Sequence, residues 1–401
     1  MKVEVIFMMR ALEGVRVVEL SHVISGPYAG MMLADMGAEV IKIERPKSGE
    51  FYREQALKNE KGISLVFPTY NRNKKGITLN LKDEKAKDII KSLIKECDIF
   101  IENYRPGLLE KMGLGYQELK KVNPKLIMVS ISGFGQTGPN ADKIAYDMTI
   151  SAVSGFMSVN GPSDEPMKTG PAISDFLSGI YAAMSSLAAL RHCERTGEGQ
   201  YIDISMMECA MSVLDAFFAQ SHFTGIEPGP LGNRRNNYSP VNSFAAKDGH
   251  VYIAASLQKH WENLAKLMER EDLLDEPRYE TSLMRKQYEQ EIEEIVSNWT
   301  INLRSKELVD MLSANDIPCA PVQSINQVRK DPQVLARESI IEIDYPDVGP
   351  YPMPRFVPIF STLEVPRMSA PTLGEHNEEV FKRLLGYTDE EYQQLLANKT
   401  I

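Results

Sequence analysis

Asp175 is the residue of this 401-residue chain whose type and position most suggest chemistry. Its carboxyl group follows Ser174 at the expected start of an apolar helix, in the segment GPAISDFLSGIYAAM. An aspartate at such a position is usually a cap or a first-turn acid, which stabilises the helix by about 0.5 to 2 kcal/mol. The alternative is a carboxylate that the helix dipole keeps ionised and that serves as a nucleophile. The spacing alone leaves both interpretations open.

Two other positions carry groups able to exchange protons. His22 lies in the loop SHVISGP after the first expected strand, where a histidine more often supports the loop through hydrogen bonds than acts in catalysis. Tyr146 and Asp147 are ordinary as a pair, because a tyrosine packs and an aspartate beside it can cap a helix. The remaining histidines show no spacing typical of a nucleophilic triad.

A glycine-rich loop follows the strand predicted at residues 126–132. Gly133, Gly135 and Gly138 spell GxGxxG, which suggests a dinucleotide and leaves an NAD-linked oxidoreductase as one alternative. Pro139 and polar residues follow, however, where that fingerprint needs a helix facing the pyrophosphate. We therefore favour a flexible loop at the end of a strand. The chain has no GxxxxGK[ST] segment, so activation of an acid by ATP on a P-loop lacks support.

Basic residues gather near the ends of the predicted strands in the first half. They suit a phosphorylated ligand, because arginine makes forked contacts with phosphate oxygens, but a solvated surface is the ordinary alternative. Asn103, Tyr104 and Arg105 combine an amide, a ring and a guanidinium, which together are able to pack a purine. The same residues also suit a simple strand end. The basic residues are Arg45, Lys47, Arg72, Lys74, Lys75, Arg105 and Lys111.

The composition excludes several classes of partner. A net charge of -10 disfavours nucleic acid and anionic membranes, and 43% hydrophobic with 25% charged residues is typical of a soluble globular protein. The four cysteines stand far apart and share no metal-ligand spacing with the six histidines, so we expect no metal site and a reducing, cytoplasmic location. The longest apolar stretch, residues 176–190, is shorter than the ~20 residues that a bilayer requires, so it predicts a buried helix.

The elements that position these residues alternate between strands and helices. Residues 14–44 have the pattern of one βαβ unit, and further strands are predicted at 76–81, 98–103 and 126–132 with helices at 83–96 and 108–121. The pattern predicts an α/β protein with a doubly wound parallel sheet and a ligand crevice at the strand ends. A short β pair and charged amphipathic helices over residues 245–330 predict a small α+β domain. Seven prolines within residues 346–371 predict extended chain.

Several segments together resemble the class III CoA-transferases, the family of formyl-CoA, carnitine and bile-acid CoA-transferases, to which the α-methylacyl-CoA racemases are related. The resemblance covers nearly the whole chain, and its blocks occur in the family's order. They are LEGVRVVELSHVISGPYAGMMLADMGAEVIKIERPKSGE, NRNKKGITLNLK, ENYRPGLLEKMGLGY, SGFGQTGP, the Asp175 segment with the downstream ERTGEGQYIDISM, and LGEHNEEV.

The resemblance implies a Rossmann-like large domain built from both ends of the chain, a smaller α+β middle domain and an interlocked homodimer. The expected divisions are 10–220 for the N-terminal part of the large CoA-binding domain, 221–244 for a linker, 245–330 for the small domain, and 331–401 for a second linker and the return to the large domain.

The resemblance also implies a reaction and its residues. Asp175 is similar to the aspartate that becomes acylated, which carries CoA from an acyl-CoA to a carboxylic acid through an anhydride and then an aspartyl-CoA thioester, with coenzyme A in the substrate and no metal. His22, Ile24, Tyr146 and Asp147 are expected near the thioester. The positions expected to bind CoA are Val23, Arg45, Leu79, Asn103, Tyr104, Arg105, Lys111, Gly133 and Gly135.

Three departures from the family pattern bear on the substrate. Tyr146 stands where the racemases carry a histidine, and a phenol with a pKa near ~10 is a poor base at pH 7, so transfer is favoured over the alternative of racemisation. Ile24 stands where the formyl-CoA enzymes carry a glutamine, and residues 225–265 contain no run of consecutive glycines. These departures disfavour a very small polar acid such as oxalate.

Overall fold

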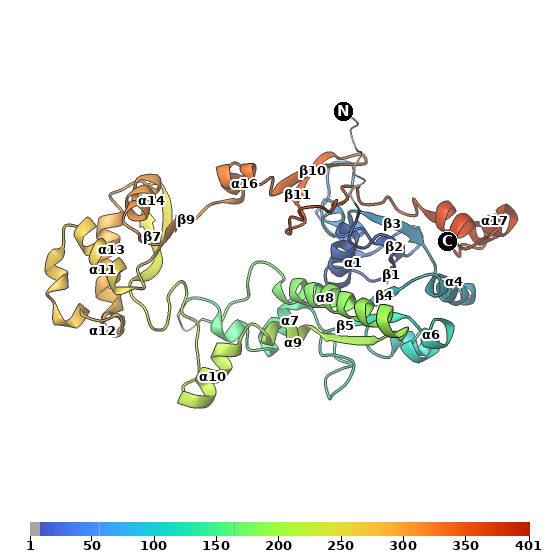
Figure 1. Ribbon diagram of the computed structural model, residues 1–401, viewed down its shortest axis with the longest axis horizontal. Coiled ribbons are helices and arrows are strands. Elements are labelled where there is room, and N and C mark those ends of the chain that lie inside the picture. Colours follow the sequence, from blue (N-terminus) through green and yellow to red (C-terminus); the bar gives the residue numbers. More distant parts are fainter. Residues whose placement is uncertain (1–8, 56, 164) are drawn as a thin grey trace. The chain divides into compact units, whose positions relative to one another are not determined.

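The computed structural model describes residues 9–55, 57–163 and 165–401 (Figure 1). The chain divides into two compact units. The larger consists of Met1–Phe156, Thr169–Phe218 and Glu338–Ile401, and the smaller of Met157–Lys168 and Ala219–Arg337. Each is described by itself, and the domain boundaries expected above stay a prediction.

A six-stranded parallel sheet forms the centre of the larger unit. Its strand order is β3-β2-β1-β4-β5-β6, so the direction of winding reverses between β1 and β4, as in doubly wound folds. This sheet confirms the predicted α/β class. The strands are β1 (Arg16–Leu20), β2 (Glu39–Glu44), β3 (Lys74–Thr78), β4 (Ile99–Glu102), β5 (Ile127–Ser132) and β6 (Tyr201–Ser205).

Both faces of this sheet are covered. Successive side chains of a strand point to opposite faces, and Val17 and Val18 accordingly belong to two different hydrophobic cores. The core containing Val17 packs against α1 (Ser25–Asp35), α8 (Ile173–Thr196) and α9 (Met206–Met211), and the core containing Val18 packs against α4 (Glu84–Lys95) and α6 (Tyr116–Val122). The other short helices are α2 (Phe51–Glu54), α3 (Phe67–Asn71), α5 (Leu108–Lys111) and α7 (Asp147–Val153).

The C-terminal segment completes the edge of the sheet next to β3. The backbone N–H of His376 donates to Gly76 at 2.9 Å, and that of Asn80 donates to Thr400 at 2.7 Å. Phe381 is fully buried in the same core as Val18. The segment contains the hairpin β10 (Ile340–Tyr345) and β11 (Gly349–Pro354), the π-helix η4 (Glu379–Leu384) and α17 (Asp389–Ala397).

One local prediction needs correction. The helix predicted at 108–121 is two helices, α5 and α6, because Gly113 adopts a positive φ of 69° between them. The chain after β6 forms α9 and then α10 (Asp215–Thr224). Part of the proline-rich stretch is extended, as predicted: it forms β11, which tolerates proline because it pairs with a strand on one side.

The smaller unit contains a three-stranded antiparallel sheet in the order β7-β8-β9. Trp261, Phe244 and Val251 lie in its core. Its strands are β7 (Val241–Ala246), β8 (Gly249–Ala254) and β9 (Cys319–Pro321). Its helices are η1 (Met157–Val159), α11 (Gln258–Leu267), η2 (Glu271–Leu274), η3 (Pro277–Tyr279), α12 (Ser282–Gln287), α13 (Glu289–Thr300), α14 (Ser305–Ala314), α15 (Ile325–Val328) and α16 (Pro332–Ala336).

Helix α8 is the apolar helix that the sequence predicts. By length and composition it is sufficient to cross a membrane, and 39% of its most apolar window is buried. It packs against α1, β5 and β6, and Figure 1 shows it running alongside the sheet. These contacts make α8 part of the core of the larger unit.

Candidate active site

A cavity of about 620 Å³ lies at the carboxyl ends of the central strands, at the point where the winding direction reverses. Ligands of open α/β sheets bind at this place, and the volume falls within the range of small-molecule sites. The cavity is lined by nine residues singled out from the sequence: His22, Val23, Asn103, Tyr104, Arg105, Lys111, Gly133, Tyr146 and Asp175.

Asp175 belongs to the first turn of α8 and is only 9% exposed. The N-cap residue of this helix, Ala172, makes no side-chain capping hydrogen bond. The carboxylate of Asp147 caps the helix instead, because its Oδ1 accepts from the Ser174 backbone N–H at 2.9 Å and from the Ser174 hydroxyl at 2.7 Å. Asp175 is thus an acid of the first turn, as one interpretation of the sequence predicts, and it lines the cavity.

The surroundings of Asp175 make its carboxylate more basic than usual. Burial raises the pKa of Asp175 to about 7, the charge of Asp147 raises it further, and a hydrogen bond from the Ser25 backbone lowers it. The phenols of Tyr52 and Tyr70 lie near enough for the charge of Asp175 to raise the pKa of both. A poorly solvated carboxylate is a stronger nucleophile than one in water.

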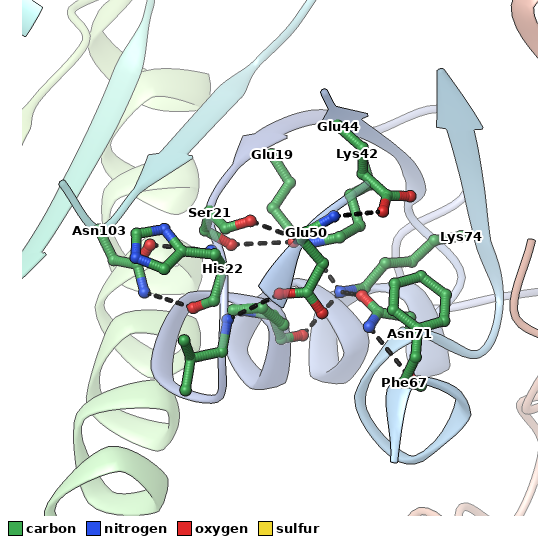
Figure 2. A network of polar contacts seen from close by, with 12 residues as sticks. Glu19, Ser21, His22, Lys42, Glu44, Glu50, Phe67, Asn71, Lys74 and Asn103 are labelled. Atoms are coloured by element: carbon green, nitrogen blue, oxygen red, sulfur yellow. Dashed lines mark hydrogen bonds and ion pairs between the residues drawn. The ribbon is translucent and has the colours of Figure 1, made fainter. Parts of the chain in front are cut away.

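The loop between β1 and α1 passes beside Asp175, and Asn103 from the end of β4 fixes it. The Asn103 side chain accepts from the His22 backbone N–H at 3.0 Å and donates to the His22 carbonyl at 2.8 Å. It also donates to the Ser25 hydroxyl at 3.1 Å (Figure 2 shows the pair with His22). This one amide therefore ties together the ends of two neighbouring strands.

His22 is a neutral imidazole at physiological pH. Burial lowers the pKa of His22 to about 4, and the charges of Lys42 and Arg45 act in the same direction. Its ring lies 5.3 Å from the ring of Tyr104. The side chain therefore offers a packing surface and a neutral hydrogen-bonding group to the cavity.

Buried ion pairs lie behind the loop (Figure 2). Glu19 on β1 pairs with Lys42 at 2.8 Å and with Lys74 at 2.7 Å, and all three side chains are completely buried. The two ammonium groups also donate to the main chain of the loop region: Lys42 to the Ser21 carbonyl at 3.0 Å and Lys74 to the Pro27 carbonyl at 2.8 Å. The charges thus fix the path of the loop.

Three of the basic groups gathered at the strand ends are therefore structural: Lys74, Arg72 and Lys75. Arg72 makes a forked contact with Asp35 at 2.9 and 2.6 Å, and Lys75 pairs with Glu39 at 2.6 Å. Of the seven basic residues listed from the sequence, Arg105 and Lys111 line the cavity. The sequence could not separate these cases, because the partners of the buried cations are remote along the chain.

The remaining candidates lie outside the cavity wall. Arg45 is exposed but close enough to His22 to lower its pKa. Leu79 is fully buried in the hydrophobic core, so its side chain presents no surface to a ligand. Ile24 is 7% exposed, and Gly135 adopts a φ of 84° in the loop after β5.

The glycine-rich loop does not lead into a helix. Turns follow Gly138, and the next helix, α7, begins at Asp147. The loop therefore lacks the helix end that a dinucleotide fingerprint requires, and Gly133 lines the cavity instead. Sequence reasoning missed several residues of this wall, of which Lys143 adds a further cation in the segment TGPNADKIAYD. The others are Ser25, Pro106, Leu108, Ile131, Ser132, Ala141, Asp142, Ile144, Ala145 and Met206.

Among the described residues, no group of three or more His, Cys, Asp or Glu side chains has the arrangement of a metal site. The groups of the cavity that are able to take part in chemistry are therefore one buried carboxylate, one neutral imidazole, and the cations of the outer wall.

The family model described as CoA-transferase family III matches residues 12–377. The chain belongs to CoA-transferase family III. The family includes the CaiB/BaiF proteins, and a solved structure of a CAIB/BAIF family protein from Brucella suis is 32% identical with a TM-score of 0.85, covering 94% of this chain and 100% of that one. This transferase accordingly moves CoA between acyl-CoA donors and carboxylic acids and is a soluble enzyme.

Curated relatives of this transferase agree with the family. It is 36% identical over 395 residues to the succinyl-CoA–D-citramalate CoA-transferase of Chloroflexus aurantiacus, with 98% of each chain covered. It is 34% identical over 395 residues to the succinyl-CoA:glutarate CoA-transferase of Mus musculus, with 98% of this chain and 91% of the relative covered. These relatives favour transfer over the racemase and oxidoreductase alternatives.

The raised pKa of Asp175 predicts that ionisation of this residue lowers the free energy of unfolding of this CoA-transferase as the pH rises. The folded state holds the proton up to about pH 7, whereas an unfolded aspartic acid releases it near its ordinary pKa of 3.8. Asp175→Asn should therefore be more stable than the wild type, and its advantage should be larger at pH 8 than at pH 5 by about 2 kcal/mol, measured by urea unfolding.

The control is Asp88→Asn, which removes the same charge from an exposed position on α4. An Asp175→Asn advantage that is the same at both pH values would contradict the raised pKa.

Proposed function

We propose that Asp175 is the nucleophile that carries CoA between the two acids. Its carboxylate attacks the carbonyl carbon of the acyl-CoA, the C–S bond breaks, and an aspartyl-acyl anhydride and CoA thiolate result. The thiolate then attacks the aspartyl carbonyl, which releases the first acid and forms aspartyl-CoA. The carboxylate of the acceptor attacks this thioester to form a second anhydride, and the returning thiolate takes the acceptor's acyl group and frees Asp175.

The observation that carries this proposal is the burial of the Asp175 carboxyl group at the wall of the cavity, beside a backbone donor. Its pKa of about 7 keeps a large fraction ionised at neutral pH, with a nucleophilicity above that of an ordinary aspartate. The Ser25 backbone donates to the Asp175 carboxyl group, and Asp175 lies in the N-terminal turn of α8, so both are proposed to stabilise the negative charge that develops during acyl transfer.

The coenzyme's charged end is proposed to lie toward the outer wall. Arg105, Lys111 and Lys143 line that wall and are exposed, so they are able to contact phosphate oxygens. The ring of Tyr104 offers a surface for the adenine, and the narrower pantetheine arm is proposed to pass along the wall that includes Gly133. Arg45, Leu79 and Gly135 are expected to contribute through the neighbouring backbone or at longer range.

We propose short dicarboxylic acids as the substrates. Relatives are named for succinyl-CoA as donor and for D-citramalate, glutarate, mesaconate or L-malate as acceptor.

Hydroxylamine trapping tests the role of Asp175. The wild-type enzyme, incubated with succinyl-CoA and hydroxylamine, should acquire a hydroxamate on Asp175, located by peptide mass spectrometry. Asp175→Ala should form no adduct and should lose at least ~10³-fold in transfer from succinyl-CoA to a pool of dicarboxylates. Asp88→Asn serves as the control. An adduct on another residue, or an active Asp175→Ala enzyme, would refute the assignment.

We further propose that the enzyme is a cytoplasmic homodimer whose two chains interlock. Exposed apolar side chains of the larger unit support a partner surface: Met184 on α8 is 55% exposed, and Phe218 on α10 is 49% exposed. Light scattering on the purified enzyme should give twice the monomer mass. A monomer at working concentration would contradict the interlocked arrangement.

A further inference from the structure

The loop that faces Asp175 contains a strained residue. Val23 adopts a φ of 68°, in the left-handed region that β-branched side chains avoid. Side chains from other parts of the chain bind the backbone just before it: Lys42 binds the Ser21 carbonyl, and Asn103 binds both backbone groups of His22. Strain of this kind persists only where the surroundings enforce it, and it is common at active sites.

Glu50 enforces the conformation of Val23 itself. Its Oε2 accepts from the Val23 backbone N–H at 2.9 Å, and Glu50 is buried, with an exposed fraction of 5%. Glu50 is in turn held by Glu44, whose Oε2 accepts from the Glu50 N–H at 3.1 Å. Arg53 fixes Glu44 through a forked contact at 2.6 and 2.7 Å (Figure 2 shows Glu44 and Glu50 beside the loop).

Stability does not account for this arrangement. Among the described residues, the second carboxylate oxygen of Glu50, Oε1, has no hydrogen-bond partner although it is buried. Burying an unpaired oxygen costs free energy, and holding Val23 in the left-handed region costs more. Two unfavourable features that meet at the loop beside a reactive carboxyl group point to a role in function.

We infer that Glu50 is a positioning residue: by holding the Val23 peptide in its left-handed conformation, it keeps the Ser25 N–H directed at the Asp175 carboxyl group. The inference rests on the proposed role of Asp175. Val23 lies two residues before Ser25, so a change of its φ turns the following peptides away from Asp175. The Ser25 N–H then no longer supports the charge that develops during acyl transfer. Glu50 itself does not line the cavity.

The test is a double-mutant cycle on Glu50 and Val23 in the full-length enzyme. Glu50→Ala removes the acceptor, and the single-turnover rate of aspartyl adduct formation at saturating succinyl-CoA should fall about 10- to 100-fold. The affinity for CoA alone, measured by calorimetry, should stay that of the wild type. Glu50→Gln should recover most of the rate, because its amide oxygen still accepts from the Val23 N–H.

Val23→Gly supplies the rescue. Glycine adopts a positive φ without penalty, so the loop needs less help to keep its path. The double variant Val23→Gly/Glu50→Ala should therefore be at least about tenfold faster than Glu50→Ala. The matched control is Glu54→Ala, an exposed glutamate at the end of α2, which should react at the wild-type rate.

Three results would overturn the inference. The first is an unchanged rate in Glu50→Ala, and the second is a double variant Val23→Gly/Glu50→Ala that is as slow as Glu50→Ala. The third is a variant that loses affinity for CoA alone and keeps its rate. If Glu50→Ala does not fold, Glu50→Gln decides, and a loss as large as 100-fold in that variant would overturn the hydrogen-bond role. Failure of the proposed function is separate, because the wild-type enzyme would then form no adduct on Asp175.

Discussion

The active site depends on one constraint: a carboxylate must be kept away from water and still be able to carry charge. Burial alone would keep Asp175 protonated and unreactive, whereas full exposure would leave it a weak nucleophile. The Ser25 N–H and the first turn of α8 offset part of the cost of burial and hold the balance near neutral pH. Asn103 and the buried ion pairs behind the loop fix the main chain around these donors.

The parallel sheet positions the groups that set the pKa of Asp175. Its winding reverses between β1 and β4, so the loops after these two strands diverge and leave the cavity between them. Asn103 bridges the two loops, and the buried Glu19 holds two lysines that fix the main chain from below. Buried ion pairs add little net stability compared with apolar packing, so their contribution here is the defined path of the loop.

Much of the fold and part of the site could be predicted from the sequence. Runs such as VRVVEL and LIMVSIS are short, apolar and rich in β-branched residues, and all of the strands predicted in the first half exist in the parallel sheet. Asp175 and the residues after β1 and β4 reach the same cavity because parallel strands end at the same edge. Such features can be predicted because they depend on the local spacing of apolar residues and on the position of a residue at the end of a strand.

The parts that could not be predicted depend on partners remote along the chain. Nothing near Lys74 in the sequence indicates that Glu19 neutralises it, and nothing near Asp175 indicates that Asp147 caps its helix. Glu50 gave no signal either, because its role follows from one hydrogen bond to a backbone group 27 residues earlier. Leu79 matched a binding position by motif but is fully buried, so its place in the fold decides what it offers.

The most direct test of this account is the pH dependence of the single-turnover rate at which Asp175 forms its adduct with succinyl-CoA. Since the carboxylate is the reacting form and its pKa is about 7, the rate should rise with pH, bend near pH 7 and stay level above it. A rate that is already level at pH 5 would mean that the carboxyl group ionises like an ordinary aspartate, and it would contradict the central claim.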